Sequence, residues 1–147
     1  SKARRMANVT KAQVAINNLA TAFATYSTEY GKWPVSDSST TNITYFVTSD
    51  LVALLQGTNT IVAVPPTGQL QGNSRGIVFM NFKTTEIDES GAFVDPWRQV
   101  YRCRFDTTYA NQIQDPFAAK TITAGVLIWS AGPDTNEAAS ADNVISW

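Results

Sequence analysis

The first thirty residues hold the stretch that decides the fold, ARRMANVTKAQVAINNLATAFATYSTEY at positions 3–30. Its apolar side chains recur at three- and four-residue steps, apart from a gap near Gln13, as on one face of an α-helix. These side chains are Met6, Val9, Ile16, Leu19, Phe23, Tyr26 and Tyr30. No proline or glycine interrupts the stretch, whereas Gly31 suits a helix C-cap and Pro34 prevents continuation. The pattern predicts one helix over residues 3–30, about 42 Å long at roughly 1.5 Å per residue.

The second half of the chain has the patterns of β-strands. Tyr101, Cys103 and Phe105 alternate with two arginines, which is typical of a half-buried strand. Residues 122–130 are richer in apolar side chains, as in a central strand, and residues 144–147 fit an edge strand. A helix followed by strands predicts an α+β domain in which the helix covers one face of an antiparallel sheet. We expect the helix to contact the sheet through Ile16, Leu19, Phe23 and Tyr26.

The length of 147 residues fits a single domain over residues 1–147. We divide it into a helix at 1–32, a variable helix and loop region at 33–94, and the sheet with a C-terminal loop at 95–147. Within the variable region, residues 51–56 predict a short helix and residues 57–76 an irregular segment. Residues 77–82 form a short apolar run that fits either a strand or a buried turn.

Composition excludes several classes of function. The net charge is -1, which gives the chain as a whole no electrostatic case for binding nucleic acid. Histidine is absent, which removes Ser-His-Asp and Cys-His catalysis. Cys103 is the only cysteine, so an intrachain disulfide is impossible, and we expect it to be buried on a strand. No apolar run approaches the roughly 20 residues of a membrane span, and because the chain begins on a helix already under way we expect a segment upstream.

Three stretches together resemble the major pseudopilin of type II secretion systems. Residues 26–34, YSTEYGKWP, are similar to the exit of the family's long helix. Residues 95–97, Asp-Pro-Trp with Tyr101 on the next strand, resemble its Asp-Pro-Trp-Gly-Asn-Pro-Tyr segment, with Arg-Gln-Val in place of Gly-Asn-Pro. Residues 129–134, WSAGPD, with the later Ala141-Asp142 and Trp147, are similar to its closing loop.

This resemblance implies a type IV pilin-like fold and a structural role rather than catalysis. It implies a subunit of a pseudopilus, a periplasmic filament that drives protein export. The partners would be identical subunits, minor pseudopilins and an inner-membrane assembly platform, with no nucleic acid and no small-molecule substrate. The subunit would sit in the bacterial inner membrane by a single N-terminal helix, with its globular domain in the periplasm. The alternative within the same fold is an adhesive or DNA-uptake type IV pilin.

The C-terminal loop contains closely spaced oxygen donors, which are Asp134, Asn136, Glu137, Asp142 and Asn143. From the residues alone, this loop fits either a solvated acidic surface or a Ca²⁺ site, since Ca²⁺ takes 6 to 8 oxygen ligands. The spacing is not that of an EF-hand. The resemblance favours calcium, because major pseudopilins bind it in this loop, and Asp134 and Asp142 match the family's ligand aspartates. The predicted ligand set is Ala131, through its carbonyl, with Asp134, Asn136 and Asp142.

Three further groups of residues are open to two interpretations each. The acids at 86, 88 and 89 fit a solvated surface better than the carboxylate pair of a hydrolase. Arginines at 98, 102 and 104 fit either a solvent face with ion pairs or one strand face that binds an anion or nucleic acid. Basic residues at 2, 4, 5 and 11 suit either solubility or a position beside membrane headgroups. The four tryptophans are expected in the core.

Overall fold

The computed structural model describes residues 1–58, 71–138 and 140–147. Its first element is the helix α1, Lys2–Tyr30. Ser1 caps the start, since its hydroxyl accepts the Arg4 N–H at 3.2 Å. Gly31 ends the helix in the left-handed conformation, with φ of 70°, and its N–H bonds to the carbonyl of Ser27 at 2.8 Å. The helix predicted over residues 3–30 is confirmed.

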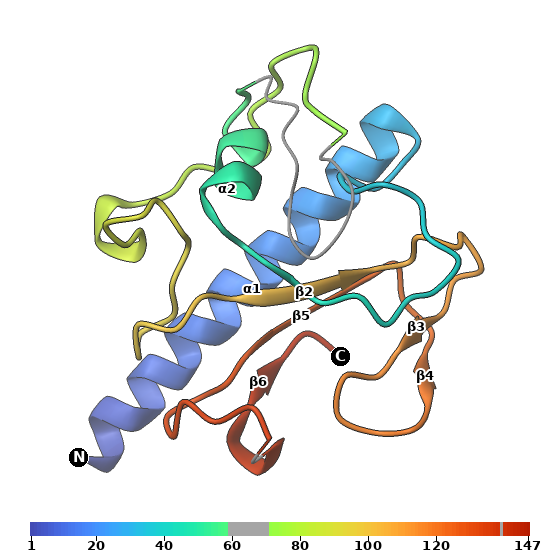
Figure 1. Ribbon diagram of the computed structural model, residues 1–147. Coiled ribbons are helices and arrows are strands. Elements are labelled where there is room, and N and C mark those ends of the chain that lie inside the picture. Colours follow the sequence, from blue (N-terminus) through green and yellow to red (C-terminus); the bar gives the residue numbers. More distant parts are fainter. Residues whose placement is uncertain (59–70, 139) are drawn as a thin grey trace.

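A four-stranded antiparallel sheet lies against this helix (Figure 1). Its spatial order is β1-β2-β5-β6. The strands are β1, Tyr45–Phe46; β2, Arg102–Phe105; β5, Val126–Ser130; and β6, Val144–Ile145. In the centre of the sheet, Cys103 is paired with Tyr45 on one side and with Ile128 on the other. The chain therefore has the α+β architecture predicted from its sequence, and the strands predicted near residues 101–105 and 144–147 are present.

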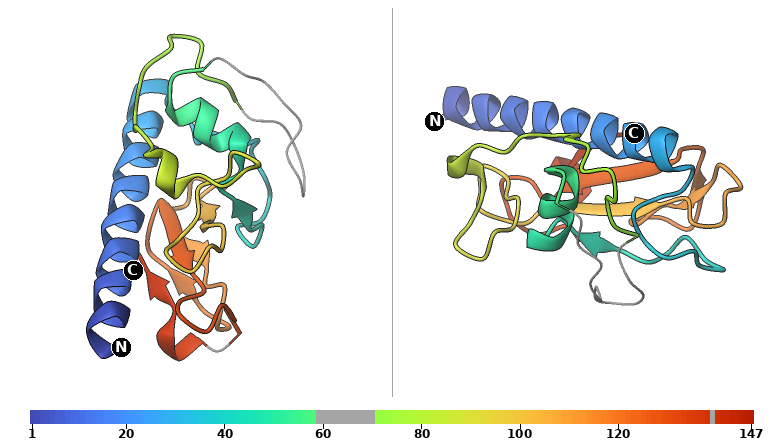
Figure 2. Two further views of the ribbon diagram at one scale, coloured as in Figure 1. Left: turned by 90° about the vertical axis from the view of Figure 1, so that its left-hand side faces the viewer. Right: turned by 90° about the horizontal axis from the view of Figure 1, so that it is seen from above.

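The main core lies between α1 and the sheet, where the two layers face each other (Figure 2). The residues through which we expected the helix to contact the sheet, Ile16, Leu19, Phe23 and Tyr26, are all fully buried. Tyr101, Cys103 and Phe105 point into the same core, as their alternation predicts. Phe105 meets Phe23 edge to face at 5.0 Å between ring centroids. Aromatic and aliphatic burial of this kind is the main term that stabilises the domain.

The opposite face of the sheet is covered by a second, smaller cluster. A hairpin of β3, Ile113–Gln114, and β4, Thr121–Ile122, supplies part of the cover. Leu127 and Trp129 project from β5 into this cluster, because they alternate with the inward-facing Ile128. Trp147 stacks on Phe117 at 5.8 Å and meets Trp129 edge to face at 6.0 Å. Residues 122–130, predicted as one strand, therefore belong to two sheets: Ile122 lies in the hairpin, and Val126–Ser130 lie in the main sheet.

The variable region adds a helix and irregular segments. The short helix predicted at 51–56 is present as α2, Ser49–Leu55, and its leucines are buried. Residues 77–82 form neither a strand nor a regular turn; the N–H groups of Phe79 and Met80 bond to the carbonyl of Leu55. Short 3₁₀ turns occur at Thr84–Glu86 and Ser140–Asp142. Of the segment predicted irregular at 57–76, residues 59–70 lie outside the described residues.

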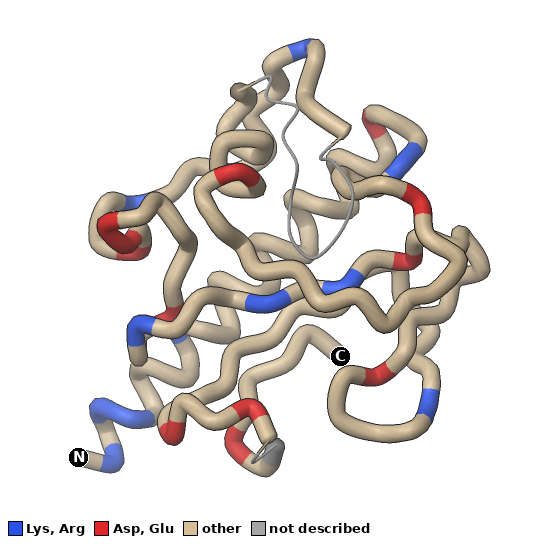
Figure 3. Tube along the Cα trace, viewed as in Figure 1, with Lys and Arg blue, Asp and Glu red and all other residues tan. Residues whose placement is uncertain are grey.

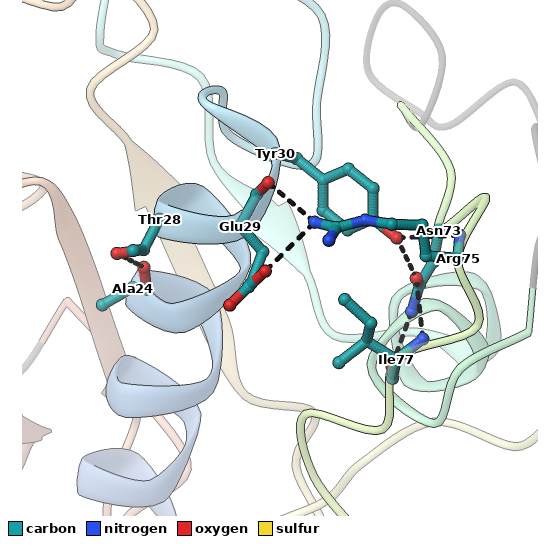
Figure 4. Close-up of polar contacts among 7 residues, drawn as sticks. All are labelled: Ala24, Thr28, Glu29, Tyr30, Asn73, Arg75 and Ile77. Atoms are coloured by element: carbon teal, nitrogen blue, oxygen red, sulfur yellow. Dashed lines mark hydrogen bonds and ion pairs between the residues drawn. The ribbon is translucent and has the colours of Figure 1, made fainter.

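A network of hydrogen bonds around Asn73 holds the segment at 71–77 against the end of α1 (Figure 4). The buried Asn73 accepts hydrogen bonds from the Tyr30 hydroxyl and from the N–H of Ile77. Its amide nitrogen donates to two carbonyls, those of Leu54 and Ile77, at 2.9 and 2.7 Å. Arg75 then reaches the carbonyl of Glu29 at 2.7 Å and lies over the Tyr30 ring. All hydrogen-bonding groups of the Asn73 amide are used, as a buried amide requires.

No helix in the described part of the chain is both long enough and apolar enough to cross a membrane.

Candidate functional site

The loop between β5 and β6 contains the predicted calcium ligands, and its two ends touch through their backbones. Gly132 has a φ of 79°, in the left-handed region that favours glycine. A Cβ placed there would lie 2.2 Å from the carbonyl oxygen of Asp142. Only glycine allows this approach, which brings the two ends of the loop together at Gly132 and Asp142.

Hydrogen bonds tie the start of this loop to the turn at residues 95–99. The Ser130 hydroxyl donates to Asp95 Oδ2 at 2.5 Å and accepts the N–H of Gly132 at 3.1 Å. The other oxygen of Asp95 accepts the N–H groups of Trp97 and Gln99, both at 2.9 Å. Asp95 is therefore a buried carboxylate with both oxygens paired, and it links the second and third stretches that carry the family resemblance.

The four predicted ligand residues have different environments. Ala131 is fully buried, and Asp142 is partly buried. Asp134 and Asn136 are exposed. Asp134 Oδ1 accepts the Asn136 N–H at 2.9 Å, and Asn136 Oδ1 accepts the Ala138 N–H at 3.2 Å. One oxygen of each exposed side chain thus stabilises the loop backbone itself.

Two oxygen atoms at the end of the loop have no hydrogen-bond partner among the described residues. They are Asp142 Oδ1 and Asn143 Oδ1, and both are buried. The second oxygen of Asp142 lies 3.7 Å from Arg5 Nη2, and the amide nitrogen of Asn143 donates to the carbonyl of Glu137 at 2.9 Å. Unpaired buried oxygens are costly, and a bound cation is one way to satisfy them.

Asn143 is among the loop's oxygen donors in the sequence, but the predicted ligand set left it out. Its oxygen is buried like that of the predicted Asp142, and the two residues line one groove of about 450 Å³ between the start of α1 and the loop. The sequence signal is the Asp-Asn pair itself, two oxygen donors in succession before β6. Figure 3 shows the setting, with basic residues at the start of α1 and acidic residues on the loop at the same end of the molecule.

Glu137 fastens the middle of the loop to the outer face of the sheet. Its Oε2 atom lies 2.8 Å from Arg102 Nε and accepts the indole N–H of Trp129 at 2.9 Å. The Arg102 side chain is only 13% exposed, so solvent screens this ion pair less than an open surface pair. The Glu137 carboxylate therefore binds side chains of the sheet and is not grouped with the other oxygen donors of the loop.

The donor chemistry fits a hard cation, but the carboxylates do not converge by themselves. Within the described residues, no group of three or more His, Cys, Asp or Glu side chains is placed to hold a metal ion. A cation at Asp142 and Asn143 would have to take further oxygens from backbone carbonyls, water or the exposed Asp134 and Asn136. Ca²⁺ accepts such mixed oxygen sets in flexible geometry.

The other candidate groups have local structural roles. Asp88 Oδ1 accepts three hydrogen bonds within its own turn, and the bond from the Ser90 hydroxyl contributes most to lowering the pKa of Asp88. The three arginines do not share one strand face: Arg102 and Arg104 lie on β2, whereas Arg98 lies in the preceding turn. Cys103 is fully buried as expected, and burial raises the pKa of its thiol.

Comparisons with known proteins give no further assignment. No protein-family model matches the chain, and searches of curated proteins and of solved structures found no match.

Proposed function

We propose that this chain is the soluble part of a type IV pilin-like subunit, a major pseudopilin of a type II secretion system. The observation that supports this proposal most is that α1 packs on the sheet along only part of its length. Its buried residues run only from Ala12 to Tyr26, so the first turns extend beyond the region that packs on the sheet (Figure 2). Met6 and Val14 remain 60% and 53% exposed on this helix. A helix with apolar residues uncovered, Met6 in its first turns and Val14 beside the buried stretch, suits packing against the helices of neighbouring subunits.

The contacts among the resembling stretches give a second line of support. The turn that begins at Asp95 and the loop that begins at Ser130 are joined directly, at 2.5 Å. Arg98 stands where the family has glycine and adopts a φ of 68°, the conformation that glycine would take. The turn therefore keeps a glycine-like geometry despite the departure in sequence.

We further propose that the C-terminal loop binds Ca²⁺, with Asp142 and Asn143 at its centre. The unpaired buried oxygens on these two residues are the motivating observation. Asp134, Asn136 and the carbonyl of Ala131 are the further donors that the family resemblance suggests. A cation here would satisfy the unpaired oxygens and stabilise the closed loop by an amount that rises with the logarithm of its concentration over the dissociation constant.

In this proposal the globular domain works in the periplasm and contributes no catalytic group. Identical subunits, minor pseudopilins and an inner-membrane assembly platform are its partners. Assembly would depend on α1 and on an apolar segment preceding it, so the chain by itself should be a monomer. Sedimentation at micromolar concentration should give the mass of one chain, and a tight oligomer would mean that the assembly contacts lie elsewhere.

Cysteine cross-linking in cells tests the proposed assembly. In the full-length subunit, expressed with its assembly system, a cysteine in place of Met6 or Val14 should form cross-links between subunits. Phe46→Cys is the matched control, because Phe46 is 46% exposed but lies on β1, away from α1. Cross-linked dimers from the helix positions and not from position 46 are expected, because one accessible cysteine per subunit can form one disulfide. Monomers only, at all three positions, would contradict the proposal.

A further inference from the structure

A second groove lies at the far end of the molecule from the start of α1. It has a volume of about 280 Å³ and runs between the segment 39–42 and the β3–β4 hairpin. Figure 1 shows these two segments side by side at the right of the view. The lining residues are Ser39, Thr40, Thr41, Asn42, Thr108, Ala110, Gln112, Gln114 and Thr121.

The lining is polar and uncharged throughout. Every lining residue except Ala110 carries a hydroxyl or an amide, and no Lys, Arg, Asp or Glu lines the groove. Phosphates and carboxylates need cationic partners, and metal ions need carboxylates or imidazoles, so the groove suits none of them. Hydroxyls and amides both donate and accept hydrogen bonds, which matches a ligand whose own groups do the same.

The walls of the groove are fixed by contacts behind the lining. The Thr41 hydroxyl accepts the N–H of Gln114 at 2.9 Å, which joins the two sides directly. Arg104 bonds to the Thr44 hydroxyl on one side and to the carbonyl of Gln114 on the other, both at 2.9 Å. Since these atoms are already held in the free protein, a ligand would meet a preformed surface.

The turn that contains Ala110 is held just as firmly. Its neighbours Tyr109 and Asn111 adopt positive φ values of 59° and 57°. The buried carboxylate of Asp106 accepts the N–H groups of Ala110 and Asn111, at 3.2 and 2.8 Å, and thereby maintains this turn. Ala110 is the one lining residue without a polar side chain, and the threonine methyl groups add further apolar surface.

Several lining side chains keep free hydrogen-bonding capacity. Within the described residues, the side chains of Ser39, Gln112 and Thr121 make no hydrogen bond, and Gln114 bonds through its backbone only. These groups come from both sides of the groove, so a ligand between them could bond to each side at once.

We propose that this groove binds an uncharged saccharide. A sugar ring presents several neighbouring hydroxyls, each donor and acceptor, together with C–H groups that can lie on the Ala110 methyl. A peptide fits less well, because its side chains would find almost no apolar or charged complement here. The groove is shallow and lacks an aromatic lining residue, so we expect weak binding of one or two sugar units, with a dissociation constant on the order of 1 mM.

A titration followed by nuclear magnetic resonance tests the proposal on this chain. The probes are maltotriose and N,N′-diacetylchitobiose as neutral saccharides, trigalacturonate as the charged counterpart, and the peptide Gly-Ser-Gly-Ser. At least one neutral saccharide should shift the backbone amides of residues 39–42 and 110–114 in a saturable way. If neither does so up to about 50 mM, or if trigalacturonate or the peptide binds there more tightly, the proposal is overturned.

Substitutions locate the site. Thr121→Val removes a lining hydroxyl at nearly constant volume and should weaken saccharide binding about fivefold, the effect of one lost hydrogen bond. Gln112→Ala should weaken it by a similar factor. Thr123→Val is the matched control, an exposed threonine two residues away that does not line the groove. Equal binding by Thr121→Val and Thr123→Val, with unchanged spectra elsewhere, would place the ligand outside this groove and contradict the proposal.

Discussion

The Cα of Gly132 lies against the carbonyl group of Asp142, so that a single added methyl group would stand 2.2 Å from the oxygen. Backbone atoms cannot move aside as a flexible side chain can. The two ends of the C-terminal loop are therefore brought together by the absence of a side chain at one position.

This relationship predicts a large effect of Gly132→Ala on stability. The left-handed conformation alone costs about 1–2 kcal/mol for alanine, and the clash should add about 1–3 kcal/mol. Gly31→Ala is the matched control, because Gly31 has a similar φ of 70° but an added methyl group there would meet no other atom within 4 Å. Urea unfolding should therefore show a clearly larger loss of unfolding free energy at position 132. Equal losses at the two positions would mean that the loop relaxes freely around the added methyl group.

Calcium should stabilise the domain through the C-terminal loop. At a calcium concentration 100-fold above the dissociation constant, the gain in unfolding free energy should be about 2.7 kcal/mol. Asp142→Ala, Asp134→Ala and Asn143→Ala should each lower the melting temperature in calcium and change it much less in chelator. Asp88→Ala, an acid outside the loop, is the control and should leave the calcium-dependent shift intact. Identical wild-type melting temperatures in calcium and in chelator would rule the site out.

The turn at Arg98 predicts a ranking of three residues. Arg98 has a φ of 68°, and its N–H bonds to the carbonyl of Asp95 at 2.9 Å. Glycine adopts this conformation without the side-chain penalty of about 1–2 kcal/mol. Because glycine is more flexible in the unfolded chain, its loss of conformational entropy on folding costs roughly 0.5–1 kcal/mol more. Both substitutions lose the exposed bond from the Arg98 guanidinium to the carbonyl of Thr85, but only alanine keeps the backbone strain. Arg98→Gly should therefore be close to the wild type in stability, and Arg98→Ala should be less stable. Alanine exceeding glycine in thermal stability would contradict this account.

Tyr26 should make the stability of the fold depend on alkaline pH. Burial, with smaller contributions from Tyr30 and Tyr109, raises the pKa of Tyr26 from 10.0 to about 12. Because the folded pKa is the higher one, this contribution is complete below pH 10 and is lost as the pH rises towards 12. Tyr26→Phe removes the hydrogen bond to Gly72 and should cost about 1 kcal/mol at neutral pH. Its unfolding free energy should then fall less steeply than the wild type's between pH 10 and 12; parallel curves would exclude this role.

The long helix and the central strand were predictable because their information is local. The three- and four-residue steps from Met6 to Tyr30 need no tertiary knowledge, and Gly31 marks the end by its own conformational freedom. The alternation around Cys103 likewise reports which face of a strand is buried.

Elements that depend on distant partners were harder to predict. Residues 122–130 look like one strand, yet Ile122 pairs with Ile113 in the hairpin while Val126 pairs with Phe105 in the main sheet. The two-residue strand β1 has too little sequence to show a period, and pairing with β2 defines it. The hydrogen bonds of Asn73 are equally hard to predict from the sequence of a polar loop, because they depend on the carbonyl groups that the fold places around this side chain.

For the candidate site, sequence indicated the loop but not its geometry. Asp142 is a predicted ligand, and its unpaired oxygen agrees with that interpretation without testing it. Asn143 needed the structure, since burial of its oxygen follows from the packing of β6 and α1 around it. Glu137 belongs to the same loop in sequence, but Arg102 and Trp129 hold its side chain on the sheet.

The central claim, that this chain is a subunit of a secretion pseudopilus, is tested most directly by protein export in the organism that encodes the chain. The measurement is the fraction of exported enzymes found in the culture medium, compared between the wild type, a deletion of this gene, and the deletion carrying the gene on a plasmid. The account predicts that deletion leaves folded enzymes in the periplasm and that the plasmid restores their release. Unchanged export in the deletion strain, with loss of surface attachment or DNA uptake instead, would contradict it.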